Sequence, residues 1–175
     1  VLEIAKNPSL AKLSEKSREQ IIKSQENVQK IVASDRTVYG INTGFGPLCD
    51  TKISESETAQ LQHNLIISHA VGVGKPIDKN ISKIMMIAKI HALSKGFSGV
   101  SLDVIERLIL MLEKDIIPVV PEQGSVGASG DLAPLAHLVL PLLGLGQVWD
   151  NDKTVETSSV LEKHNIQPLK KKKKE

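Results

Sequence analysis

Aromatic side chains are scarce in this chain, and that scarcity restricts how its interior can be built. The four among its 175 residues are Tyr39, Phe45, Phe97 and Trp149. A core of normal size must therefore come from Leu, Ile, Val and Ala side chains. After Ser101 these residues recur at helical spacing, at Val104, Ile105, Leu108, Ile109 and Leu112. The pattern predicts an aliphatic, helix-rich interior.

Other segments complete the expected outline. We expect helices over residues 14–34, from about 55 to 72, and over 80–95, 131–143 and 159–165. Ser54 and Glu57 form a capping-box pattern at the start of the second. An extended segment over 116–120 and a hairpin over 147–156 would supply some strand. The expected fold class is mainly α, with long loops and a little β.

Charge and cysteine content narrow the function classes. The formal net charge is +2, but without Lys170–Lys174 and Glu175 the chain keeps 17 basic and 19 acidic residues. The basic tail therefore accounts for the basic isoelectric point of the chain. Because the rest of the chain is slightly acidic, we expect no nucleic-acid partner. The single cysteine, Cys49, cannot form an internal disulfide, which fits a reducing, cytoplasmic compartment. No apolar run approaches membrane-spanning length, so no membrane partner is expected.

Residues 124–131 read Gly-Ser-Val-Gly-Ala-Ser-Gly-Asp and precede an expected helix. Such a loop could bind an anion at the helix N-terminus, or it could be an ordinary flexible connection. Its glycine spacing does not match the phosphate-binding motifs. A third interpretation is chemical, because an Ala-Ser-Gly tripeptide can cyclise.

Cyclisation would join the amide nitrogen of Gly130 to the carbonyl carbon of Ala128, with loss of water. Ser129 would then lose its hydroxyl as a second water. The product is a methylidene-imidazolone (MIO), an electrophile made without an added cofactor. Gly130 suits the reaction because it lacks Cβ and lets the chain fold back tightly. Asp131 is placed to help move protons during closure.

The run from Gly124 to Leu138 resembles the signature of the aromatic amino acid ammonia-lyase family, and within it the histidine branch. Tyr39–Gly46 is similar to the family's tyrosine loop, and Leu61–Gly74 is similar to its substrate-selectivity helix. The three motifs follow in the family's order and approximate spacing. Lys89 and His91 depart from the family pattern, which usually has Arg and often Asn there.

This resemblance implies a fold and an organisation. The fold would be the N-terminal domain of the fumarase/aspartase-like helical superfamily. Residues 1–169 would form the MIO-bearing domain, without the C-terminal helical bundle of the family. Residues 170–175 would be a non-native or disordered lysine-rich tail.

The resemblance also implies roles at a site. Ala128, Ser129 and Gly130 would form the catalytic MIO group, with Asp131 assisting its formation. Tyr39 would be the catalytic base that takes the β-proton. The residues expected to bind substrate are His69, Asn42 and Gly46. Since the histidines show no metal-ligand spacing and the chain has no cysteine cluster, we expect no metal, and no lysine context suggests pyridoxal phosphate.

The implied reaction is the loss of ammonia from L-histidine to give trans-urocanate. The partners would be a small amino acid substrate and, in the full-length family, further subunits of a homotetramer that share active sites. Residues 1–175 alone are therefore expected to be inactive. Two alternatives remain open: a tyrosine ammonia-lyase or tyrosine aminomutase with the same electrophile, and a non-catalytic helical binding domain.

Overall fold

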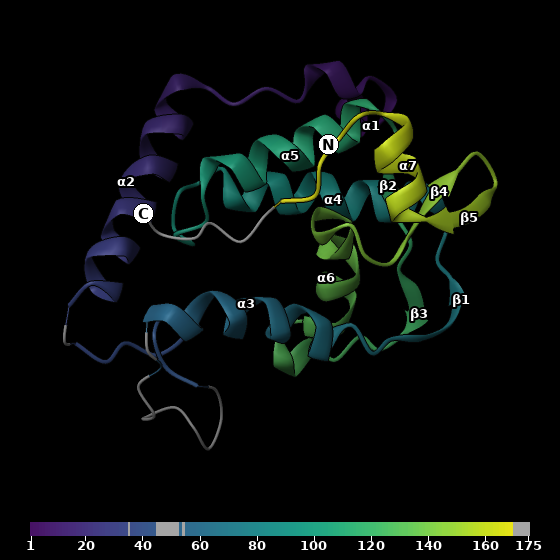
Figure 1. Ribbon diagram of the computed structural model, residues 1–175. Coiled ribbons are helices and arrows are strands. Elements are labelled where there is room, and N and C mark those ends of the chain that lie inside the picture. The colour runs from purple at the N-terminus through teal and green to yellow at the C-terminus, as the bar shows by residue number, and fades with distance from the viewer. Residues whose placement is uncertain (35, 45–52, 54, 170–175) are drawn as a thin grey trace.

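The computed structural model describes residues 1–34, 36–44, 53 and 55–169. The α-helices are α1 (Leu2–Lys6), α2 (Glu15–Val32), α3 (Glu55–His69), α4 (Lys79–Leu93), α5 (Leu102–Glu113), α6 (Leu132–Val139) and α7 (Thr157–Lys163). The short 3-10 helices are η1 (Pro8–Leu10), η3 (Gly127–Ser129) and η4 (Leu140–Leu143). The strands are β1 (Val73–Pro76), β2 (Ile117–Pro118), β3 (Pro121–Gln123), β4 (Gln147–Asp150) and β5 (Lys153–Glu156). The predicted fold class, mainly α with long loops and a little β, is confirmed (Figure 1).

The core lies where α4 packs against α5 and against β2. From α5 it receives four side chains at helical spacing, Ile105, Leu108, Met111 and Leu112, all fully buried. Burying an aliphatic side chain of this size stabilises the fold by about 1.5–3 kcal/mol. Among the aromatic residues that the structure describes, Tyr39 and Phe97 are exposed and Trp149 is partly buried. The prediction of an aliphatic core is confirmed, with methionine added to it.

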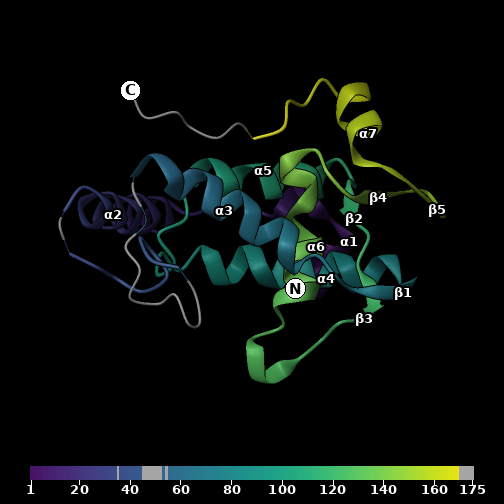
Figure 2. The same cartoon turned by 60° about the horizontal axis from the view of Figure 1, so that its bottom comes forward.

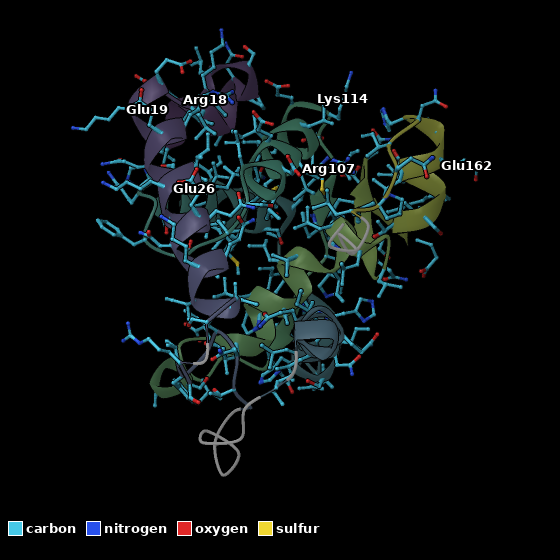
Figure 3. All side chains as sticks on the ribbon, turned by 60° about the vertical axis from the view of Figure 1, so that its left-hand side comes forward. Arg18, Glu19, Glu26, Arg107, Lys114 and Glu162 are labelled. Carbon is cyan, nitrogen blue, oxygen red and sulfur yellow. The ribbon has the colours of Figure 1, made fainter. Side chains whose placement is uncertain are left out.

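Helix α2 lies against α5 along one edge of the molecule. The Ser14 side chain caps α2 by accepting a hydrogen bond from the amide of Ser17 at 3.2 Å. Arg18 then reaches Glu106 of α5, with 2.5 Å between the guanidinium nitrogen and the carboxylate oxygen. Figure 3 shows that Arg18 shares α2 with Glu19 and Glu26, which are exposed. The predicted helix over residues 14–34 is thus observed as α2.

The strands form two small antiparallel sheets. In one, β4 pairs with both β2 and β5, so the hairpin predicted over 147–156 is confirmed. In the other, β1 pairs with β3, with Val73 opposite Gln123 and Pro76 opposite Pro121. This second pairing was not predicted from the sequence. It joins the segment after α3 to the segment before residues 124–131.

The helix predicted over residues 131–143 is observed in two parts. It is α-helical to Val139 and continues as the 3-10 helix η4 from Leu140. Pro141 has no amide hydrogen, so it cannot donate the bond that would extend the α-helix. Figure 2 shows α3 lying across α6, and the two helices are in contact. Within the described part of the chain, no helix is long and apolar enough to cross a membrane.

Candidate functional site

Residues 126–131 form a compact, hydrogen-bonded turn. The Val126 carbonyl oxygen accepts bonds from the amide and the hydroxyl of Ser129, at 3.0 and 2.8 Å, and from the amide of Asp131 at 3.2 Å. The Gly130 amide donates to the Gly127 carbonyl at 3.1 Å. The Ala-Ser-Gly tripeptide is therefore held in a tight turn by its own backbone.

Two successive left-handed residues lead the chain out of this turn into α6. Gly130 has φ +82° and Asp131 has φ +57°. A Cβ at Gly130 would find open space, so its conformation rather than crowding calls for glycine there. Residues 124–130 are exposed, and Figure 2 shows this loop projecting from the body of the molecule. A tight turn with open surroundings fits the closure of Ala128-Ser129-Gly130 into MIO.

The carboxylate of Asp131 is directed back toward the loop. Its Oδ1 atom accepts a hydrogen bond from the Ser125 hydroxyl at 2.6 Å. Asp131 is the N-cap residue of α6, yet its side chain caps none of the helix amides. An aspartate at this position normally bonds to those amides. Here its described hydrogen bond is to the loop instead.

A hollow of about 470 Å³ lies beside the loop, between α4, α6 and β3. Ser125, Gly130 and Asp131 line its loop side, and Lys89 and Glu122 contribute charge. The rest of its wall is mostly apolar and includes Ile77, Met85, Ala88, Val120, Pro134 and Leu135. The loop of residues 124–131 therefore borders a cavity with both apolar and charged walls.

His69 lies at the C-terminal end of α3. Its Nδ1 atom is 2.7 Å from the Leu65 carbonyl oxygen and 3.2 Å from the Ser68 hydroxyl. Because a carbonyl oxygen can only accept, Nδ1 carries a proton. In the neutral ring Nε2 is then a hydrogen-bond acceptor, and no partner for it is found among the described residues. His69 can thus offer an acceptor to a polar ligand.

The segment after α3 and the loop of residues 124–131 are in contact through Gly72. A Cβ added at Gly124 would lie 3.1 Å from the Gly72 Cα, so the two backbones are in direct contact. The Gly72 amide also donates a 3.0 Å hydrogen bond to Nε2 of His137 on α6. Burial lowers the pKa of His137 below its ordinary value of 6.5, which favours the neutral ring that this bond requires. Together with the β1–β3 pairing, these contacts hold the segment that follows His69 against residues 124–131.

Residues 36–42 form a turn around Tyr39, the Tyr39 turn. It is held together by Asn42, which is 2% exposed. The Asn42 carboxamide donates to the Arg36 carbonyl and accepts from the Val38 amide, both at 2.8 Å. Gly40 has φ +77°, and Tyr39 itself is 63% exposed. The observed contacts of the Asn42 side chain are thus to its own loop. Its predicted contact with substrate remains a prediction.

The Tyr39 turn is anchored near the start of α3. The Asn42 carbonyl accepts a hydrogen bond from the Ile53 amide at 2.9 Å, two residues before the helix begins. A helix of this length spans about 20 Å, so His69 lies far from that anchor. Figure 1 shows the turn beside the first part of α3 and η3 below its last part. Within one chain, the segment that follows His69 therefore contacts the loop of residues 124–131, and the Tyr39 turn lies toward the other end of α3. Gly46 lies outside the described residues.

Two residues with site contacts were not singled out by the sequence analysis. Ser125 bonds to Asp131, and His137 bonds to Gly72. Two signals were available in the sequence. Ser125 is a hydroxyl residue six positions before Asp131, and His137 is a polar residue on an otherwise apolar helix. In the described ranges, no group of three or more His, Cys, Asp or Glu side chains could hold a metal ion.

Comparison with known proteins gives consistent matches. A family model described as aromatic amino acid lyase matches residues 1–175. The chain is 51% identical over 157 residues to the histidine ammonia-lyase of Shouchella clausii (strain KSM-K16), covering 90% of this chain and 31% of that protein. It is 48% identical over 159 residues to the histidine ammonia-lyase of Bacillus subtilis (strain 168), covering 91% and 31%. The chain thus spans about a third of the length of these curated relatives.

Solved structures are similar as well. A histidine ammonia-lyase from Trypanosoma cruzi superposes with a TM-score of 0.81 at 34% identity, over 90% of this chain and 30% of that one. A tyrosine aminomutase from Streptomyces globisporus superposes with a TM-score of 0.85 at 31% identity, over 97% and 32%. Both similarities extend over nearly all of residues 1–175.

Proposed function

Because the chain belongs to the aromatic amino acid lyase family, we propose that it is the electrophile-bearing N-terminal part of an ammonia-lyase acting on L-histidine. The reaction would release ammonia and form trans-urocanate. The observation that carries the proposal is the contact of the two motif segments. The Gly72 backbone behind His69 touches Gly124, at the start of the Ala-Ser-Gly loop. The identity to named histidine ammonia-lyases supports the choice of substrate.

Ala128, Ser129 and Gly130 would supply the MIO group, and their turn fits its formation. Once formed, MIO would provide an electron-accepting centre for covalent catalysis without a metal or pyridoxal phosphate. The Asp131 carboxylate lies directly after the tripeptide and would exchange protons during closure. These assignments are supported by the hydrogen bonds that hold residues 126–131 in place.

His69 would select the substrate ring. With its proton fixed on Nδ1 by the Leu65 carbonyl, Nε2 can accept a hydrogen bond from an imidazole N–H. Gly46 would add a further contact with the substrate. A phenylalanine ring offers no such donor, so a polar residue here favours histidine or tyrosine.

Tyr39 would remove the β-proton from a substrate bound by another copy of the chain. Its turn is anchored at the start of α3, whereas His69 is at the end, so an intermolecular role fits the separation. We therefore propose that the full-length protein is a homotetramer whose active sites combine residues of several subunits. It would act on a small amino acid in the cytoplasm, without a nucleic-acid or membrane partner.

A tyrosine aminomutase or tyrosine ammonia-lyase is the second candidate. The similarity to tyrosine aminomutase structures supports it, and Nε2 of His69 could equally accept from a phenol. The full-length protein should be supplied separately with L-histidine and L-tyrosine. Urocanate as the product supports the first candidate. Coumarate or β-tyrosine supports the second.

The mass of the tryptic peptide Asp115–Lys153 tests the shared electrophile. In the full-length protein this peptide should lack two water masses, and Ser129→Ala should restore at least the second of them, since the alkene cannot form without the hydroxyl. An unmodified wild-type peptide would refute the MIO proposal and favour a non-catalytic helical binding domain.

A further inference from the structure

We propose that Ser125 is a positioning residue for MIO formation, acting by holding the Asp131 carboxylate toward the Ala-Ser-Gly turn. The inference rests on the proposed function, because it concerns how that electrophile is made. Nothing in the sequence pattern alone distinguishes Ser125 from the other small residues of the loop.

The geometry of the pair is specific. The Ser125 hydroxyl lies 2.6 Å from Oδ1 of Asp131, and an ionised carboxylate can only accept, so the hydroxyl donates. The backbone of Asp131 has a left-handed conformation, with φ +57°, and its side chain caps none of the α6 amides. The bond from Ser125 therefore replaces the usual capping contact of an N-cap aspartate. It fixes one carboxylate oxygen and leaves Oδ2 available to exchange protons.

Ring closure requires several proton transfers, and the Asp131 carboxylate is placed to carry them out. The first water takes the Ala128 carbonyl oxygen together with the amide hydrogens of Ser129 and Gly130. The second takes the Ser129 hydroxyl together with its Cα hydrogen. No oxidant or reductant is needed. A carboxylate that can accept and return protons beside these atoms accelerates such steps.

The hydrogen bonds of the Ser129 and Gly130 amides explain why the orientation of the Asp131 carboxylate matters. The Ser129 and Gly130 amides donate to the Val126 and Gly127 carbonyls, so both bonds must break as the ring closes. Once they break, the backbone of the turn is freer to move. The Ser125–Asp131 bond does not involve the reacting amides and can persist through closure. It would keep the carboxylate in place while the rest of the turn rearranges.

The test follows ring closure over time in the full-length protein made by cell-free synthesis. Samples taken at intervals are digested, and the fraction of Asp115–Lys153 that lacks two waters is measured. We expect Ser125→Ala to slow closure by about tenfold or more, and Ser125→Thr to restore it because it keeps the hydroxyl. Ser158→Ala, at an exposed serine of α7, is the matched control and should close at the wild-type rate.

A double-mutant cycle then separates positioning from loop structure. If Ser125 acts through Asp131, Ser125→Ala should have no further effect in the Asp131→Ala background. Additive effects, wild-type closure of Ser125→Ala, or no rescue by threonine would each overturn the proposal. If the wild-type peptide itself stays unmodified, the MIO proposal fails instead. Thermal melting of each variant checks that its fold is intact.

Discussion

Nε2 of His137 and the backbone amide of Gly72 form a 3.0 Å hydrogen bond between residues 65 positions apart. The bond connects α6, which follows the loop of residues 124–131, to the segment that follows His69. It exists only while Nε2 has a free lone pair, that is, while the imidazole is not doubly protonated. The link between the two motif segments should therefore depend on pH.

Acidification should weaken the fold through His137. Burial lowers the pKa of His137 from 6.5, so the unfolded chain takes up this proton at a higher pH than the folded chain does. The contribution to stability is thus present above about pH 6.5 and is lost as the pH falls through the folded-state pKa. His137→Gln should make the decrease in unfolding free energy between about pH 7.5 and 5.5 shallower, by up to about 1 kcal/mol.

Urea unfolding of the 1–175 chain at a series of pH values measures this. His164→Gln, at an exposed histidine just after α7, is the matched control and should keep the wild-type slope. A His137→Gln slope equal to the wild-type slope would contradict the role assigned to the Gly72 bond.

Gly130 should tolerate alanine less well than Gly127. A Cβ would meet no atom within 4 Å at either position, but only Gly130 has a left-handed φ, at +82°. Gly130→Ala should therefore lower the unfolding free energy by about 1–2 kcal/mol, whereas Gly127→Ala should change it by less than about 1 kcal/mol. Urea denaturation in a Ser129→Ala background measures both in a chain that cannot form the complete MIO group. Equal effects would show that the left-handed turn is not required.

Asp115 should stabilise the fold at neutral pH and lose that effect in acid. Burial alone would raise the pKa of Asp115, but the hydrogen bonds from Lys79 and Lys83, at 2.5 and 2.6 Å, outweigh it and lower the pKa below 3.8. The contribution is therefore present above about pH 3.8 and is lost as the pH falls through the lowered value. Asp115→Asn should cost about 1 kcal/mol at pH 7, since the side chains are partly exposed.

Asparagine is a suitable replacement because it tolerates the left-handed φ of +54° at this position. Urea unfolding at about pH 7 and about pH 3 should show the difference from wild type becoming smaller in acid. Asp152→Asn, at the exposed tip of the β4–β5 hairpin, should match wild type at both pH values. A difference for Asp115→Asn that is undiminished in acid would argue against the ion pairs.

Replacing His69 should change the substrate preference of the full-length enzyme. His69→Phe removes the Nε2 acceptor, so kcat/KM for L-histidine should fall at least about tenfold. Turnover of L-phenylalanine relative to L-histidine should rise. His69→Gln keeps a hydrogen-bonding side chain and should lose less. Unchanged kcat/KM in His69→Phe would place substrate recognition elsewhere.

The helices of the core were predictable because each depends on the spacing of residues within one short stretch of sequence. The aliphatic spacing of α5 follows from one stretch of sequence, and the hairpin around Asn151 follows from one turn. The end of α6 at Val139 was not predicted, because the expected helix over residues 131–143 continued past Pro141. A missing amide hydrogen there was visible in the sequence.

The arrangement of the site was less predictable because it depends on contacts between distant segments. Val73–Pro76 has neither the alternation nor the composition of a strand, and it pairs with β3 only in the folded chain. The motif residues Ser129 and His69 could be named from the sequence. The Gly72–His137 bond that relates their segments could not, nor could the position of the Tyr39 turn at the other end of α3.

The backbone contact between Gly72 and Gly124 has a consequence for protein engineering. Neither loop can be lengthened, shortened or given a larger residue at the contact without disturbing the other. A designer who wishes to transplant residues 69–76 from a relative would therefore have to transfer residues 121–137 with them. The two stretches, distant in the gene, are a single exchangeable part of the molecule.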